Sequence, residues 1–239
     1  TPAPTPTPPG ATVLMSDNFD RPNGLITNEY ATYNPNQAGV FKDAQWWSDS
    51  GSFFAQNNTG WSGRPDAVAP NINSSTSTNS SIFRLWTKRT TFGDAAIEVD
   101  LRVNGLTSTT KTPAASWDGF HVVTRRQSSG ARYYVTMNRR DGVMIIKKQT
   151  ATFAYCTLTG TEIKGAYSIP IGRWQKLRVT SKLNADGTVT VQGLVDGVVR
   201  TSARDTGSMC GAPLREAGSV GLRSDNIDFN VDNFRISAL

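Results

Sequence analysis

Residues 119–148 read GFHVVTRRQSSGARYYVTMNRRDGVMIIKK, and this stretch decides the fold class. Apolar and polar side chains alternate along three runs, residues 119–127, 132–138 and 143–148. Such alternation is the period of a half-buried β-strand. Ser128-Ser129-Gly130 and Arg140-Asp141-Gly142 separate the runs, and glycine supplies the positive φ that a tight hairpin needs. The stretch therefore predicts three consecutive antiparallel strands.

Similar runs fill the rest of the chain: residues 97–103, 174–183, 188–195, 198–203, 219–223 and 230–236. No long window shows the 3.6-residue period of an amphipathic helix. Strands joined by Gly, Asp and Asn turns predict an all-β fold, a two-sheet antiparallel jelly-roll β-sandwich, with residues 11–239 as a single domain. Two stretches rich in Asn, Ser and Thr, residues 55–81 and 104–118, are predicted to be long loops that carry function.

Composition narrows the class of protein further. Of the 239 residues, 37% are hydrophobic and 18% charged, and Gly (21) and Pro (12) are frequent, which excludes coiled coils, helical bundles and collagen-like chains. No apolar run is long enough to span a membrane. Lys and Arg number 25 against 19 Asp and Glu, and the net charge of +6 is compatible with an acidic partner. The basic residues lie in scattered pairs without a nucleic-acid-binding motif, so no nucleic-acid partner is expected.

The first ten residues, TPAPTPTPPG, alternate Pro with other small residues and predict a stiff, extended linker. Such spacers are typical of secreted modular proteins, so we expect a domain tethered to another domain or to the cell surface; the alternative is a disordered tail. Cys156 and Cys210 are the only cysteines, and in a secreted chain they are expected to form a disulfide.

The ends of the domain carry distinctive motifs. It opens with Asp17-Asn18-Phe19-Asp20-Arg21-Pro22 and closes with Asp232-Asn233-Phe234-Arg235-Ile236. Between them lie Gly172-Arg173-Trp174-Gln175-Lys176-Leu177, Asp186-Gly187-Thr188-Val189 and Val195-Asp196-Gly197. In this order the motifs resemble the concanavalin A-like lectin/glucanase superfamily, which includes laminin-G-like modules, carbohydrate-binding modules, glucanases and polysaccharide lyases. The resemblance implies two curved antiparallel sheets with sugar-binding potential on the concave face.

The resemblance also implies that the first and last strands lie side by side and share a structural calcium ion. Asp17, Asp20 and Asp232 are the candidate ligands, with Asp228 as a further carboxylate, because calcium prefers oxygen ligands. The alternative is that Asp20 and Asp232 cap turns or pair with Arg21 or Arg235.

Period-two alternation places His121 and Arg125 on one face of their strand, and Tyr134 and Asn138 on one face of the next. Together with Lys147 they are expected to form a basic groove on the concave face. Such a set fits β-elimination on a polyuronate: Arg125 neutralises the substrate carboxylate, and His121 or Tyr134 moves the protons. The alternatives are ordinary strand residues or sugar binding without chemistry. The match to jelly-roll lyases is one of residue type alone, since the RxExR, QIH and YxKxGxY signatures of the alginate lyases are absent.

Glycoside hydrolases of family 16 carry three carboxylates at alternate positions of one strand. Glu98 and Asp100 fit that spacing, but Arg102 stands where the acid/base is required, and an arginine cannot donate its proton at neutral pH. We therefore interpret this strand as an exposed face of alternating charge.

Two tryptophans lie in stretches of small polar residues, Trp61 in TGWSG and Trp117 in ASWDG. An exposed indole offers a platform for the C–H face of a sugar, and a neighbour such as Asp118 can bind hydroxyls; loop anchoring is the alternative. Trp86 and Trp174 are expected to lie in the core.

These observations lead to three hypotheses. The first is a secreted carbohydrate-binding module that recognises a polysaccharide through the concave sheet face and the loops bearing Trp61 and Trp117. The second is a polysaccharide lyase that uses His121, Tyr134 and Arg125 on an acidic glycan. The third is a cell-surface adhesion module, since laminin-G-like sandwiches also bind proteins.

Overall fold

The three strands expected in residues 119–148 are present and lie next to one another. They are β8 (Phe120–Arg126), β9 (Arg132–Met137) and β10 (Ile145–Gln149), and each pairs antiparallel with the next. In this computed structural model, residues 11–63, 81–158 and 167–239 are described. The Pro/Thr-rich linker, residues 1–10, and most of the loop predicted at 55–81 lie outside the described residues.

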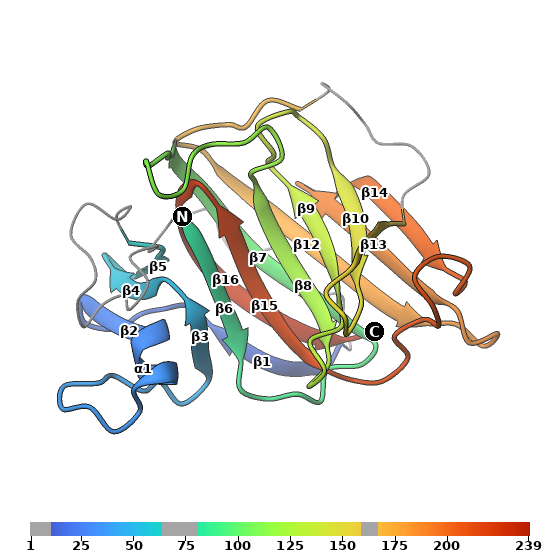
Figure 1. Ribbon diagram of the computed structural model, residues 1–239, viewed down its shortest axis with the longest axis horizontal. Coiled ribbons are helices and arrows are strands. Elements are labelled where there is room, and N and C mark those ends of the chain that lie inside the picture. The colour runs from blue at the N-terminus through green and yellow to red at the C-terminus, as the bar shows by residue number, and fades with distance from the viewer. Residues whose placement is uncertain (1–10, 64–80, 159–166) are drawn as a thin grey trace.

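Among the described residues, the strands form two antiparallel sheets that face each other, which confirms the two-sheet jelly-roll β-sandwich (Figure 1). The seven-stranded sheet has the order β11 (Tyr155–Thr157), β10, β9, β8, β15 (Ser219–Asp225), β6 (Ile82–Thr87) and β3 (Trp46–Ser50). The nine-stranded sheet has the order β14 (Val198–Asp205), β13 (Val189–Val195), β12 (Trp174–Leu183), β7 (Ala95–Leu106), β16 (Ile227–Ala238), β5 (Thr59–Trp61), β4 (Ser52–Gln56) and β2 (Gly24–Asn28). β1 (Val13–Asp17) pairs with β16, so the first and last strands are neighbours, as expected.

The regions between strands differ in part from expectation. β4 and β5 lie within or next to the stretch predicted as a long loop from residue 55, and they form a hairpin through Asn57 and Asn58. Both asparagines have positive φ, the conformation that two-residue hairpins require. One short helix, α1 (Glu29–Tyr33), is capped by the Asn28 side chain, which accepts a hydrogen bond from the Ala31 amide.

The hydrophobic core fills the space between the two sheets. Phe229 of β16 contacts Phe83 and Phe120 of the opposite sheet edge-to-face, at ring-centroid distances of 5.2 and 5.1 Å. Each of these rings is fully buried, and their edge-to-face geometry is the favoured one for aromatic pairs. Because these contacts join β16 of one sheet to β6 and β8 of the other, they pack the two sheets against each other.

A β-bulge interrupts β8 near its end. Arg125 has a φ of 50°, and the pairing of β8 with β15 shifts register at this point. A Cβ on Gly218 would lie 2.5 Å from the Arg126 carbonyl oxygen, so the bulge fits only because residue 218 lacks a side chain. The bulge reverses the alternation, and Arg126 rather than Arg125 shares the outer face with His121 and Val123.

The predicted disulfide between Cys156 and Cys210 is present, with the two Cα atoms 6.1 Å apart. It joins β11, an edge strand of the seven-stranded sheet, to the segment that follows β14, an edge strand of the nine-stranded sheet. No helix in the described part of the chain is long and apolar enough to cross a membrane.

Candidate functional site

A pocket of about 360 Å³ opens on the outer face of the seven-stranded sheet. We call it the His121 pocket; its lining comprises Trp117, His121, Tyr134, Thr136, Arg139, Lys147, Tyr155, Arg223 and Asp225. Strand register explains why these residues meet. Lys147 pairs with Tyr134, and His121 pairs with Thr136 on one side and Arg223 on the other, so two adjacent cross-strand rows point to the same face.

The imidazole of His121 is held by hydrogen bonds at both ring nitrogens. Nδ1 lies 2.8 Å from Thr136 Oγ1, and Nε2 lies 3.2 Å from Asp225 Oδ2. Asp225 also forms an ion pair with Arg223 at 3.0 Å. Burial lowers the pKa of His121, and the charges of Arg223 and Lys147 lower it further, against the opposing effect of Asp225. The histidine is therefore neutral at neutral pH.

Arg223 also approaches two tyrosines of the pocket. Its Nη1 lies 3.4 Å from the Tyr134 hydroxyl and 3.5 Å from the Tyr155 hydroxyl. Burial raises the pKa of Tyr134, although Arg223 and Arg132 act in the opposite direction. For Tyr155, which is half exposed, burial is outweighed by the charge and hydrogen bond of Arg223, so its pKa is lowered. The two phenols thus differ in acidity within one pocket.

A row of alternating cations and rings extends from the pocket across the same face. The guanidinium of Arg126 lies 5.0 Å from the ring centroid of Trp47 and 4.6 Å from that of Trp86. Arg132 lies 5.2 Å from Trp86 and 5.3 Å from Tyr134, and Arg223 lies 5.5 Å from Tyr134. We call these six residues the arginine–aromatic row. Among the described residues, neither Arg126 nor Arg132 has an ion-pair partner, so the row carries uncompensated positive charge.

Three residues predicted to bind ligand or act in catalysis lie elsewhere. Arg125 is 1% exposed and turned to the inner side, where it pairs with Asp94 at 2.5 Å, so the predicted sharing of a face with His121 is wrong. Asn138 has a φ of 53°, and its buried amide donates to Gln175, so it too is absent from the groove. Asp118 is buried and accepts hydrogen bonds from the Ala115 amide and Asn226, which makes it a loop anchor.

The two predicted tryptophan platforms lie on different sheets. Trp117 is 64% exposed and lines the His121 pocket. Trp61 is in β5 and lines a separate hollow on the nine-stranded sheet together with Trp174, which is half-buried there rather than in the core. Trp86 is buried, but under the arginines of the outer face rather than between the sheets.

The acidic strand residues also lie on the nine-stranded sheet. Glu98 pairs with Arg178 at 2.8 Å, and Asp100 with Lys176 at 2.9 Å. Arg102 is exposed on the same strand. The alternation of charge is present, but Asp100 is buried beneath Lys176, so the face is not exposed along its whole length as predicted.

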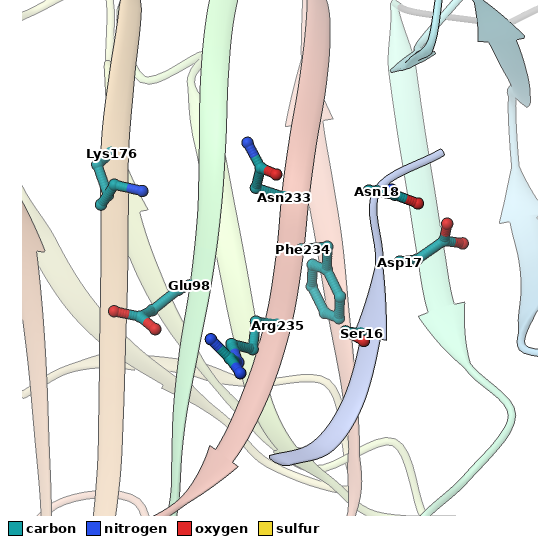
Figure 2. A pocket seen from close by; sticks show the side chains of 8 residues that line it. All are labelled: Ser16, Asp17, Asn18, Glu98, Lys176, Asn233, Phe234 and Arg235. Carbon is teal, nitrogen blue, oxygen red and sulfur yellow. The ribbon is translucent and has the colours of Figure 1, made fainter. Parts of the chain in front are cut away.

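The predicted calcium ligands lie where β1 meets β16. Figure 2 shows a neighbouring pocket in which Glu98, Lys176 and Arg235 come from three adjacent strands and Asp17 from β1. The Asp17 carboxylate is occupied by Arg21, the Trp46 indole and the Phe19 amide. Burial raises the pKa of Asp232, and the charges of Asp100 and Asp20 add to this effect.

Within the described residues, no three His, Cys, Asp or Glu side chains are grouped as metal ligands would be. Calcium binding through Asp17, Asp20 and Asp232 stays a prediction.

Arg223, Asp225 and Tyr155 line the pocket but were not predicted from the sequence. Arg223 and Asp225 alternate with Ser224, so their sharing of a face was readable from the sequence. Their meeting with His121 was not readable, because β15 and β8 are adjacent in the sheet but far apart along the chain.

Together these observations define a two-sheet jelly-roll β-sandwich with a basic, aromatic pocket on one sheet. No family model matches the chain, and no curated protein matches it. Its structure is similar to that of the carbohydrate-binding module CBM66 from Bacillus subtilis, with a TM-score of 0.54 and 11% identity over 81% of this chain and 96% of that one.

Two further similar structures are enzymes. An endo-1,3-β-glucanase from Streptomyces sioyaensis has a TM-score of 0.54 and 14% identity, covering 98% of both chains. SCLam, a non-specific endo-β-1,3(4)-glucanase of family GH16, has a TM-score of 0.58 and 10% identity, over 99% of this chain and 98% of that one. At these identities the similarity establishes the fold.

Proposed function

We propose that the domain is a carbohydrate-binding module that binds an acidic polysaccharide on the outer face of the seven-stranded sheet. The observation that carries the proposal is the arginine–aromatic row, which leads into the His121 pocket. Sugar rings stack their C–H faces on indole and phenol rings, and uronate carboxylates pair with guanidinium and ammonium groups.

The charge of the pocket favours an acidic over a neutral ligand. Its lining contains three cationic side chains, Arg139, Lys147 and Arg223, and one carboxylate, Asp225; outside the lining, Asp141 pairs with Arg139. Trp117 stands exposed at the rim, as a platform for a sugar unit requires. The similarity to a carbohydrate-binding module and to glucanases supports a glycan as the ligand class.

We also propose that the domain acts outside the cell, tethered through residues 1–10. The disulfide supports this location, because disulfides persist in oxidising compartments.

Affinity electrophoresis in gels containing polygalacturonate or alginate tests the binding proposal, with laminarin as the neutral comparison. Both acidic polymers should retard the protein, and added salt should weaken the effect. Lys147→Met should reduce the affinity about tenfold, as expected for loss of one charge-assisted contact. Lys182→Met makes the same charge change at an exposed site on β12 of the other sheet and should have no effect. Equal loss in both variants, or no retardation by either polymer, would contradict the proposal.

A second candidate function, β-elimination on the same acidic glycan, is favoured by the position of two tyrosine hydroxyls, those of Tyr134 and Tyr155, within 3.5 Å of Arg223 Nη1 in the pocket. Tyr155 would remove the C5 proton, the electron pair would form the C4–C5 double bond, and the C4–O bond would break. Tyr134, which stays protonated, would donate a proton to the leaving oxygen. Lys147 would neutralise the substrate carboxylate, in place of the predicted Arg125.

The ultraviolet absorbance of the unsaturated uronyl product tests this candidate directly. If the protein is a lyase, absorbance rises with polygalacturonate or alginate, and Tyr155→Phe abolishes the rise while binding persists. Binding of both polymers without any rise would leave the carbohydrate-binding module as the function.

A further inference from the structure

A second hollow, of about 450 Å³, lies on the outer face of the nine-stranded sheet. Its lining comprises Gln56, Asn57, Thr59, Trp61, Arg102, Asn104, Trp174, Asp228 and Asn230. Register brings these residues together, since Trp174 pairs with Arg102, Arg102 with Asn230, and Asn230 with Trp61. The four residues form one row across β12, β7, β16 and β5. Figure 1 shows β12, β7 and β16 behind the seven-stranded sheet, with β5 at the left.

The two indoles stand at the ends of this row. Three strand spacings separate them, about 14 Å between backbones. Trp61 is fixed in orientation, because its Nε1 donates to Asp228 at 2.8 Å and its ring lies 5.6 Å from that of Phe54. Both tryptophans are half-buried, so each retains exposed ring surface. The row thus ends in one indole of fixed orientation, Trp61, and a second partly exposed indole, Trp174, and such rings can serve as stacking platforms.

Amide groups fill the space between the indoles. Asn104 donates to Asn230 at 2.7 Å, and Asn230 donates to Thr59 at 2.8 Å. Amides both donate and accept hydrogen bonds, which matches sugar hydroxyl groups. The charged lining residues are one cation, Arg102, and one carboxylate, Asp228, so this hollow lacks the positive excess of the His121 pocket.

We propose that this Trp61–Trp174 surface is a second glycan-binding site, selective for a neutral polysaccharide chain lying across β12, β7, β16 and β5. The domain would then hold two glycans of different charge on its two outer faces. The site does not depend on the function proposed for the His121 pocket, because it lies on the other sheet and shares no residue with that pocket.

The indole N–H signals of the unaltered protein provide the test. The chain has six tryptophans, whose ¹H–¹⁵N signals are assigned with single Trp→Phe variants. The probes are laminarihexaose, cellohexaose, xylohexaose and mannohexaose. At least one should shift the signals of Trp61 and Trp174 and leave that of Trp117 in place. An oligogalacturonate should do the reverse. If none of the four neutral probes moves Trp61 or Trp174, or if they move Trp117 instead, the inference is overturned.

Two variants measure the contribution of the site by calorimetry with the responding probe. Trp174→Ala should weaken binding about tenfold, the value of one lost stacking platform. Arg102→Ala alters an exposed side chain, cannot impair folding through burial, and should weaken binding several-fold. Trp174→Ala should keep full retardation by polygalacturonate. Loss of neutral binding with acidic binding retained supports two sites, whereas unchanged neutral binding in both variants refutes the second.

Discussion

At the scale of single residues, the chemistry of the His121 pocket depends on the protonation state of its histidine. The other titratable groups that line the pocket are Asp225 and Arg223 on β15, Lys147 on β10, Tyr134 on β9, Tyr155 on β11 and Arg139 after β9. Only Asp225 favours the protonated imidazole. Despite burial, the hydrogen bond with His121 and the charge of Arg223 hold the pKa of this carboxyl far below its usual range. The imidazole therefore stays neutral, with its two ring nitrogens engaged by Thr136 and Asp225.

We predict that the histidine titrates below its ordinary pKa of 6.5. The chain has a single histidine, so its ¹H NMR signal is unambiguous. The unfolded chain takes up this proton near pH 6.5 and the folded chain only at lower pH. The contribution of His121 to stability is thus fully present above about pH 6.5 and is lost as the pH falls through the folded pKa.

Two variants identify the charges that set the pKa of His121. Lys147→Met removes a positive charge and should raise the midpoint, whereas Asp225→Asn removes the stabilising carboxylate and should lower it. A wild-type midpoint above 6.5, or shifts of the opposite sign, would show that the pocket is solvated differently.

At the scale of strands, the sequence predicted where most elements lie but not every face they present. The alternation in residues 119–127 correctly placed His121, and the alternation in 132–138 correctly placed Tyr134. Arg125 and Asn138 failed because each adopts a positive φ, which breaks the period of two. The first break depends on Gly218, a residue 93 positions away from Arg125 that permits close approach, and no local pattern reveals it.

Separate substitutions of the adjacent residues Arg125 and Arg126 test which of the two side chains faces the pocket. Arg125→Ala should lower the free energy of unfolding by about 3 kcal/mol, because it deletes a buried side chain that pairs with Asp94 and bonds Ser181. Arg126→Ala removes a half-buried member of the arginine–aromatic row and should weaken acidic-glycan binding with a smaller loss of stability. Denaturant unfolding and affinity electrophoresis measure the two effects.

A regular strand would give the opposite pattern. Arg125 would then face the pocket with His121, and its loss would impair binding more than stability. That outcome would remove the bulge and return Arg125 to the predicted site.

At the scale of the whole molecule, the sandwich presents two outer faces with different chemistry. Rows of residues in register create both: Lys147 and Tyr134 belong to one, Trp174, Arg102 and Trp61 to the other. Composition showed only a net charge of +6, whereas the fold stacks Arg126, Arg132 and Arg223 against aromatic rings on the seven-stranded sheet and pairs Glu98 and Asp100 with cations on the nine-stranded one. Strand order, which decides this separation, is a property of long-range pairing that the sequence does not display locally.

The disulfide connects the edges of the two sheets, and its removal should affect stability and binding together. A separation of 54 residues between Cys156 and Cys210 corresponds to about 4 kcal/mol in the chain-entropy model. The Cys156→Ser/Cys210→Ser variant should therefore melt roughly 8–16 °C lower. Lys148 still holds the segment after β14 through the carbonyls of Gly211 and Ala212, so local opening should concentrate in β11.

Because β11 has only three residues and carries Tyr155 into the His121 pocket, its opening should also weaken acidic-glycan binding. Hydrogen exchange should show lost protection at Tyr155–Thr157, and dithiothreitol should reproduce the effect in the wild-type protein. Neutral-glycan binding at the Trp61–Trp174 surface should survive, since β11 belongs to the other sheet and β13 separates β14 from β12. A variant that melts at the wild-type temperature with full protection in β11 would show that the bridge contributes nothing to this edge.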